Sequence, residues 1–123
     1  MIEFLYHTKF DSEMKSLLKK YKNQTDVGFE SLKNLLSKQF DVTNPEIVIG
    51  NSKIHRILDM QPGVATIWKV EMSIKGLRPS QWPRVWFLLS VDKIYFLHVA
   101  THQDNYDNTY STREAGNRAN DFI

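Results

Sequence analysis

The feature that most constrains the fold is a pair of apolar segments in the last third of the chain. Residues 85–89 and 94–99 are rich in aromatic and branched side chains, and the polar pair Asp92-Lys93 lies between them. Two such runs around a short polar turn are typical of an antiparallel pair of strands. The sequence becomes polar over residues 101–106, at the open end of this predicted hairpin. We therefore expect a functional site near that end.

The first part of the chain predicts one strand and two helices. Alternation over residues 2–6 predicts a short strand. Apolar side chains then recur at helical spacing over residues 10–21 and again over 29–40, and each segment predicts an amphipathic helix. Thr25 or Asp26 is expected to cap the second helix. The short connection predicts an antiparallel helical hairpin.

Strand signals return in the second part. Turn signals dominate residues 43–63, which we interpret as a partly ordered connection with room for one short strand. Residues 66–75 alternate, so that Lys69 and Glu71 share the polar face of a strand. Arg84 opens the next strand and is expected to face away from the core. Ser111 and Glu114 have the spacing of a capping box, which predicts a short terminal helix.

This order of elements predicts an α+β fold in one domain that spans residues 1–123. The helical hairpin is expected on one face of a small, antiparallel-rich sheet, with the short helix at the carboxyl end. A sheet covered on one side leaves its other face free. Polar side chains at alternate positions of the middle strands would then be presented by a rigid element, which is suitable geometry for a site.

Composition removes several classes of function. The chain has no cysteine, which excludes disulfides and thiolate metal sites, and its four histidines lack ligand spacing. We therefore expect no metal and no cofactor. The first residues contain no long apolar run, so we expect neither a signal peptide nor a membrane span. We therefore expect a cytoplasmic protein. A net charge of +2 argues against a general polycation.

The chain resembles the RelE/ParE toxin superfamily, and within it the ribosome-dependent mRNA interferases of the RelE and HigB type. The opening strand and helical hairpin match that family, and so does a polar tail that leads to a helix. Three segments match as well: IWKVEM at 67–72, RVWFLL at 84–89 and KIYFLHV at 93–99. The resemblance covers about residues 2–40 and 65–122, and residues 43–63 stay unaligned.

The resemblance implies a RelE-like fold and the toxin of a type II toxin-antitoxin system. Such a toxin is an endoribonuclease that cleaves mRNA in the ribosomal A site by metal-independent attack of the 2′-hydroxyl. Its partners would be a cognate antitoxin, the ribosome and mRNA, with no membrane; the oligomeric state stays open. The residues that the resemblance implies as catalytic are Arg84, Lys69, His102 and Glu71. Those implied as RNA-binding are Lys75, Arg78, Trp82, Gln103, Tyr106 and Tyr110.

These residue types suit RNA cleavage without a metal. An arginine fork matches phosphate oxygens in a bidentate way that lysine cannot, and an imidazole exchanges protons near neutral pH. The resemblance implies that Arg84 stabilises the charge that develops at phosphorus. It also implies that Lys69 contacts the phosphate or transfers a proton and that His102 serves as acid or base.

Several alternatives remain open at the level of sequence. Arg84 could pair with Glu71 across neighbouring strands, since cross-strand charge pairs are ordinary. His98, which shares a side with Ile94, Phe96 and Ala100 in the predicted strand, is interpreted as a hydrogen-bonded, partly buried histidine in preference to a catalytic one. Gln103 stands where RelE has an arginine, and the loop over residues 76–83 is longer than that of the family. The alternative function is a non-enzymatic, ParE-like gyrase inhibitor or an inactive relative on the same scaffold.

Overall fold

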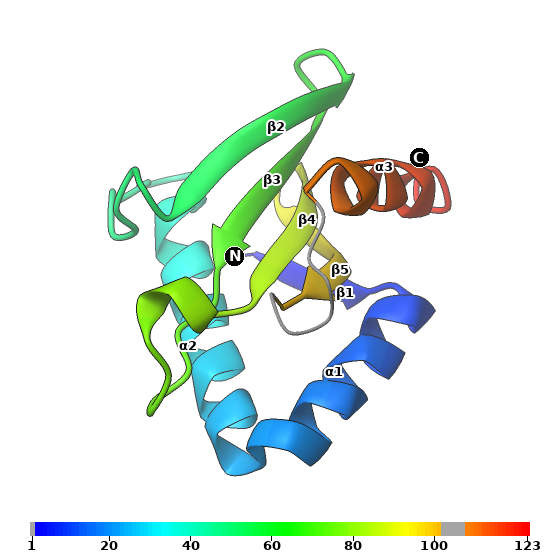
Figure 1. Cartoon of the computed structure of the whole chain (residues 1–123). Helices are drawn as coiled ribbons and strands as arrows, with labels where there is room; N and C mark the ends of the chain where they lie inside the picture. Colours follow the sequence, from blue (N-terminus) through cyan, green and yellow to red (C-terminus); the bar gives the residue numbers. More distant parts are fainter. Residues whose placement is uncertain (1, 102–107) are drawn as a thin grey trace.

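Three helices, one short 3₁₀ helix and five strands make up the part of the chain that the computed structural model describes, residues 2–101 and 108–123 (Figure 1). The fold is α+β, as the order of sequence signals predicts. The elements are, in chain order, β1 (Glu3–Tyr6), α1 (Thr8–Tyr21), α2 (Asn23–Gln39), β2 (Ile54–Gln61), β3 (Ala65–Glu71), η1 (Pro79–Gln81), β4 (Arg84–Ser90), β5 (Lys93–Ala100) and α3 (Asn108–Ala119).

A single residue, Lys22, separates the first two helices. Its backbone has a φ of 53°, which turns the chain abruptly, and α2 begins at the next residue. Thr25 is therefore inside α2, where its buried hydroxyl donates to the carbonyl of Leu17 over 3.2 Å. The expectation that Thr25 or Asp26 caps the second helix is wrong for this reason. The two helices open as a V in Figure 1.

The five strands form one sheet in the order β1-β5-β4-β3-β2. The predicted hairpin is confirmed as β4 and β5, which pair antiparallel, while β1 pairs with β5 in parallel. The short strand allowed in the connection is confirmed as β2, which covers residues 54–61 and pairs antiparallel with β3. Sequence patterns alone did not show that β2 lies beside the polar positions of β3.

A bulge in β5 changes the side on which His98 lies. Trp86 is opposite His98, whereas the next residue of β4, Phe87, is opposite Phe96, so Leu97 is an extra residue. His98 consequently lies beside the ring of Trp86, at a centroid distance of 5.3 Å, and not with Phe96 in the core beneath α1. The predicted side of His98 is wrong, because a bulge interrupts the alternation on which the prediction was based.

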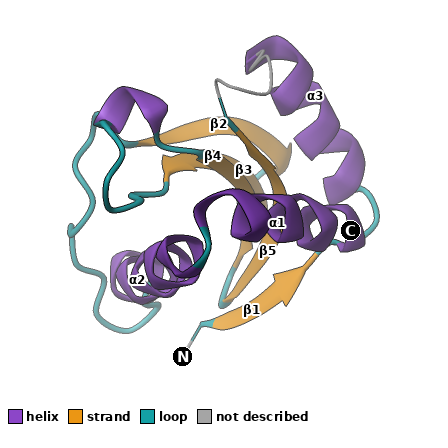
Figure 2. Cartoon of the chain, turned by 60° about the horizontal axis from the view of Figure 1, so that its bottom comes forward, coloured by secondary structure: helices purple, strands orange, loops and turns teal. Residues whose placement is uncertain are grey.

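Each face of the sheet carries its own hydrophobic cluster. The larger one packs α1 and α2 against the sheet, and in it Phe96 stacks against Phe4 and Phe10 at centroid distances of 5.7 and 5.4 Å. The smaller cluster places α3 on the opposite face (Figure 2) and contains Ala65, Ile67, Trp86, Leu88, Leu97, Ala115 and Ala119. The second face is therefore partly covered by α3. The expectation of a free second face is wrong. Among the described residues, a cavity lies on this face beyond the cluster.

The start of α3 also differs from the prediction. The helix begins at Asn108, so Ser111 lies within its first turn and cannot be its N-cap. The hydroxyl of Ser111 lies 3.1 Å from Nε2 of His98, and Glu114 accepts a hydrogen bond from Arg118 over 3.0 Å. The capping-box prediction is wrong, because both side chains hydrogen-bond to other partners.

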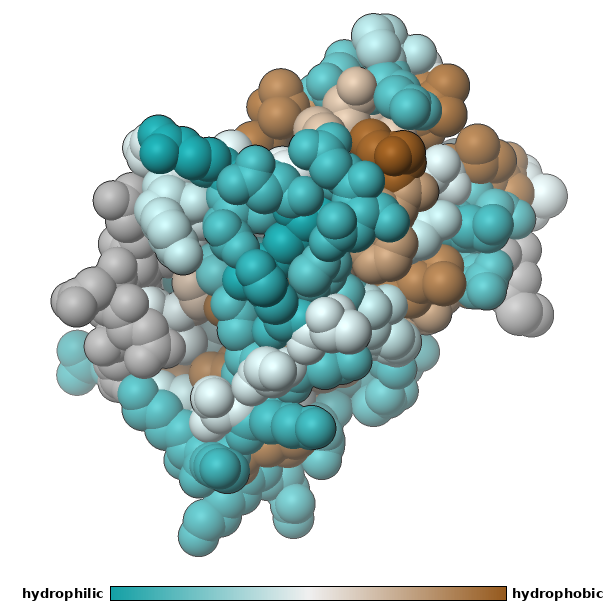
Figure 3. Space-filling view, turned by 90° about the vertical axis from the view of Figure 1, so that its right-hand side faces the viewer, coloured by the Kyte–Doolittle hydropathy of each residue, from teal (hydrophilic) through white to brown (hydrophobic). Residues whose placement is uncertain are grey.

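The outer surface around α3 is polar. Figure 3 shows a largely hydrophilic face in which apolar side chains form several separate groups and not one broad patch. No helix in the described ranges is both long enough and apolar enough to cross a membrane.

Candidate functional site

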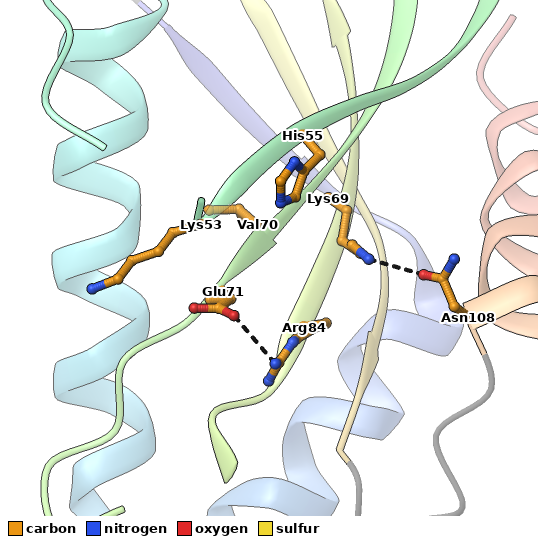
Figure 4. Close-up of a pocket in the computed structure, with 7 residues that line it drawn as sticks. All are labelled: Lys53, His55, Lys69, Val70, Glu71, Arg84 and Asn108. Carbon is orange, nitrogen blue, oxygen red and sulfur yellow. Dashed lines mark hydrogen bonds and ion pairs between the residues drawn. The ribbon is translucent and has the colours of Figure 1, made fainter. Parts of the chain in front are cut away.

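A cavity of about 320 Å³ lies where β2, β3 and β4 meet the start of α3 (Figure 4). Charged and polar side chains dominate its wall. The residues that line it are Lys53, His55, Lys69, Val70, Glu71, Arg84 and Asn108.

Strand pairing brings the charged side chains of this cavity together. Glu71 on β3 is directly opposite Arg84 on β4, and Lys69 on β3 is directly opposite His55 on β2. Lys69 and Glu71 are two residues apart, so their side chains leave the same face of the strand. Lys69, Glu71 and Arg84, which the sequence predicts as site residues, therefore line one cavity.

Arg84 is held in place by two contacts. Its Nη2 lies 3.2 Å from Oε1 of Glu71, and its Nη1 donates a hydrogen bond to the carbonyl of Trp82. The Arg84 side chain is only 15% exposed, so it lies partly buried at the wall of the cavity and does not face outward. The cross-strand pair that the sequence left open is confirmed. A guanidinium has five N–H donors, and these two contacts use only part of that capacity.

Lys69 connects the centre of the sheet with the start of α3. Its Nζ donates to Oδ1 of Asn108 over 2.9 Å and lies 5.9 Å from the centroid of the Trp86 ring. The small hydrophobic cluster fixes the position of α3, and α3 places Asn108 at the rim of the cavity. Asn108 was not predicted as a site residue, because its approach depends on how α3 packs.

Lys53 and His55 are two further residues of the cavity that the sequence did not predict as site residues. Lys53 directly precedes β2 and His55 is its second residue, and both belong to the segment that we interpreted from the sequence as a connection. Nε2 of His55 lies 3.2 Å from the carbonyl of Ser52, and in Figure 4 the ring lies beside Lys69, whose side chain runs toward Asn108. Lys53 extends toward α2, with its Nζ 4.8 Å from the centroid of the Trp82 ring. The sequence contained one signal that could have identified His55 as a site residue, its position next to the apolar Ile54 that begins the strand.

The charge of this cavity suits an anion. Three cationic side chains, Lys53, Lys69 and Arg84, surround one carboxylate, Glu71. A concave site lined mainly by one sign of charge attracts ligands of the opposite sign. Arg84 supplies a planar fork for phosphate oxygens, Lys69 supplies a point charge, and His55 supplies a group that can carry a proton. Within the described ranges no three His, Cys, Asp or Glu side chains lie close enough to hold a metal ion.

The other predicted RNA-binding residues lie in different places. Trp82 lines a neighbouring cavity, and its indole N–H donates to the carbonyl of Leu77 over 3.2 Å. Lys75 and Arg78 are exposed in the β3–β4 connection, and Tyr110 is 58% exposed on α3; none of these three lines the 320 Å³ cavity. His102, Gln103 and Tyr106 lie outside the described residues.

His98 belongs to a buried polar cluster behind the site. Its Nδ1 lies 2.9 Å from Oε2 of Glu13, its Nε2 lies 3.1 Å from the Ser111 hydroxyl, and its exposure is 5%. The interpretation of His98 as a hydrogen-bonded, buried histidine is confirmed. Nη1 of Arg118 donates to both Oε1 of Glu13 and the carbonyl of Leu97 over 2.8 Å, so this cluster holds α1, β5 and α3 together.

No known protein family, curated protein or solved structure matches the chain.

Proposed function

We propose that the chain is an endoribonuclease that cleaves mRNA in the ribosomal A site without a metal ion. The observation that supports this proposal best is the convergence of Lys69, Arg84 and His55 in one cavity. A phosphate clamp and a proton carrier are the two requirements of 2′-hydroxyl attack, and here they come from three neighbouring strands.

The proposed reaction assigns a role to each of these groups. A base removes the 2′-hydroxyl proton, O2′ attacks phosphorus, and the bond to the 5′-oxygen breaks as that oxygen takes up a proton. The products are a 2′,3′-cyclic phosphate and a 5′-hydroxyl. Arg84 stabilises the charge on the phosphoryl oxygens, and Lys69 holds the phosphate between Arg84 and His55. Glu71 keeps the guanidinium in position.

Two histidines are available to carry the protons. His55 lies in the cavity, across the strand pair from Lys69. His102 follows β5 in the sequence and holds the position that the resemblance to RelE and HigB toxins marks as acid or base. We assign the proton transfer to His55, because it lines the same cavity as Lys69 and Arg84. His102 is the competing assignment.

The resemblance supplies the biological setting of the proposal. A toxin of the RelE/ParE superfamily acts in the cytoplasm on ribosomes, and a cognate antitoxin holds it inactive. The positive cavity suits a negatively charged partner such as ribosomal RNA.

A second function, inhibition of gyrase without catalysis, is favoured by one feature of the same cavity. Arg84 is already bound by Glu71 and by the Trp82 carbonyl, and Lys69 is bound by Asn108. A binding protein can keep its charged groups in such internal pairs, whereas a nuclease has to redirect part of them to the phosphate.

Purified protein added to programmed ribosomes separates these two functions. The nuclease proposal predicts cut mRNA in the A-site codon, with the 2′,3′-cyclic phosphate and 5′-hydroxyl ends that attack by the 2′-hydroxyl leaves. Intact mRNA together with blocked DNA supercoiling by gyrase would move the assignment to the second function. Lys19→Ala, which removes an exposed lysine on α1 remote from the cavity, is the matched control and is expected to cut like the wild type.

A further inference from the structure

A second cavity, of about 250 Å³, adjoins the site and differs from it in chemical character. The two cavities share Lys53, Val70 and Glu71, so they adjoin each other at these residues. The second cavity lies between α2, the segment before β2 and the segment after β3. Its wall includes the aliphatic side chains of Leu32, Leu35, Val48 and Ile49 and the ring of Trp82.

Close packing of α2 gives this cavity a fixed shape. A Cβ added to Gly28 would lie 2.4 Å from the carbonyl oxygen of Ser73, so the helix touches the backbone beyond β3. On the opposite side, the hydrogen bond from the Trp82 indole to the Leu77 carbonyl holds the ring. A preformed, mainly apolar cavity with a few polar groups at its edge is the usual form of a binding site for a small organic group.

We propose that this second cavity binds the nucleobase next to the phosphate held by Lys69 and Arg84, an inference that rests on the proposed function. The adjoining positive cavity determines the choice of occupant, because a ligand that fills both must join a flat apolar group to an anion. A nucleotide has this composition. The hydroxyls of Ser31 and Ser73 at the wall offer hydrogen bonds to the polar edge of a base.

Lys53 connects the two halves of the proposed nucleotide site. Its Nζ lies 4.8 Å from the centroid of the Trp82 ring and covers that ring by a cation–π contact. A phosphate in the first cavity attracts this ammonium group, since Lys53 lines both cavities. Its movement toward the phosphate uncovers the ring, and the base can then stack on Trp82.

Binding of nucleoside 5′-monophosphates and of ribose 5-phosphate, followed by NMR titration, tests the base cavity without any cleavage reaction. The wild type is expected to bind at least one nucleotide roughly 5- to 100-fold more tightly than ribose 5-phosphate, the range that base stacking on an aromatic side chain provides. Ser31→Trp fills the cavity from α2 and should abolish this difference. Lys69→Ala should weaken both ligands by the same factor.

Asn34→Trp is the control, because Asn34 is exposed on α2 and does not line the cavity. It should bind both ligands as the wild type does. Equal affinity of the wild type for nucleotides and for ribose 5-phosphate would overturn the base cavity, even if the protein cuts mRNA. Tight, Ser31→Trp-sensitive nucleotide binding by a protein that leaves mRNA intact would keep the base cavity and reject the nuclease. Absence of binding by every ligand would also overturn the base cavity, and the cleavage assay on programmed ribosomes would decide the nuclease separately.

Discussion

Glu13 on α1 and Arg118 on α3 form an ion pair of 2.8 Å between helices that pack on opposite faces of the sheet. The pair forms at the edge of β5, because β1 ends at Tyr6 and pairs with β5 only as far as Phe96. Beyond that point β1 no longer pairs with β5, and the Glu13 carboxylate accepts a hydrogen bond from the N–H of Val99 over 3.2 Å. One carboxylate thereby completes the sheet edge and fixes α3, which carries Asn108 to the site.

The environment of Glu13 favours its ionised form. Burial raises the pKa of the Glu13 carboxyl, but the hydrogen bonds and charges of His98 and Arg118 outweigh burial, so its pKa lies below the ordinary value of 4.5. An acid with a lowered native-state pKa stabilises the fold fully above its unfolded-state pKa. This stabilisation is lost as the pH falls from about 4.5 through the native-state pKa.

Glu13→Gln is expected to lower the free energy of unfolding by about 1–3 kcal/mol at neutral pH, because Arg118 and His98 lose a charged partner. The difference from the wild type should shrink as the pH falls below about 4.5. Urea denaturation over this pH range measures both effects. Glu30→Gln, which alters the exposed partner of Lys33, is the control and should change stability by less than about 1 kcal/mol. A stability loss for Glu13→Gln that stays unchanged down to pH 3 would contradict this account.

Arg84→Ala is expected to reduce mRNA cleavage roughly 10²-fold or more, because it removes the proposed stabiliser of charge at phosphorus. Arg84→Lys should restore little, since a point charge lacks the planar fork. Single-turnover cleavage on programmed ribosomes is the measurement, with unfolding by urea to show that the variants are folded. Arg56→Ala removes an arginine that is paired with Asp59 outside the cavity, and it should leave the rate unchanged. Full cleavage by folded Arg84→Ala would exclude Arg84 from the reaction.

The sequence predicted most of the elements because their signals are local. Helical spacing and alternation each depend on neighbouring residues, and they correctly placed α1, α2, β3 and the β4–β5 hairpin. The errors came from tertiary contacts. Lys22 adopts a backbone conformation with positive φ that lets α2 start early, and the bulge at Leu97 moves His98 to the other face. Neither feature has a periodic signal.

The same distinction holds for the site. Lys69 and Glu71 were predicted together because they alternate on one strand, and Arg84 joins them through antiparallel pairing. Lys53 and His55 were missed as site residues because their relation to Lys69 requires the β2–β3 register, which includes two irregularities. Lys75 and Arg78, which follow β3, lie away from the 320 Å³ cavity, since the strand ends at Glu71.

His55→Ala is expected to lower the chemical step about 10²- to 10⁴-fold, the usual contribution of a general acid or base. Ribosome binding should change little, because the cationic side chains of the cavity remain. Added imidazole should restore part of the rate by occupying the space of the missing ring. Cleavage assays of His55→Ala and His102→Ala, with and without imidazole, decide between the two histidines. An unchanged rate in His55→Ala with a lost rate in His102→Ala would transfer the role to His102.

Two glycines within helices are expected to respond in opposite ways to alanine. A methyl group added at Gly116 on α3 would meet no tertiary neighbour within 4 Å among residues 2–101 and 108–123, so Gly116→Ala should stabilise the fold by about 0.5–1 kcal/mol through helix propensity. At Gly28 the same methyl group would lie 2.4 Å from the backbone oxygen of Ser73, which cannot move without shifting the chain after β3. Gly28→Ala should therefore lower stability by about 1–3 kcal/mol, as overpacking usually does.

The Gly28 substitution also tests how the second cavity is built. Gly28 and Ser73 both line this cavity, so separation of α2 from β3 should weaken nucleotide binding while phosphate binding at Lys69 and Arg84 is retained. Thermal unfolding and the nucleotide titration, run on both alanine variants, measure the two effects. Gly116→Ala should bind nucleotides as the wild type does. If the two variants are stabilised equally, the close approach of α2 to Ser73 does not exist in solution, and the shape of the base cavity loses its structural support.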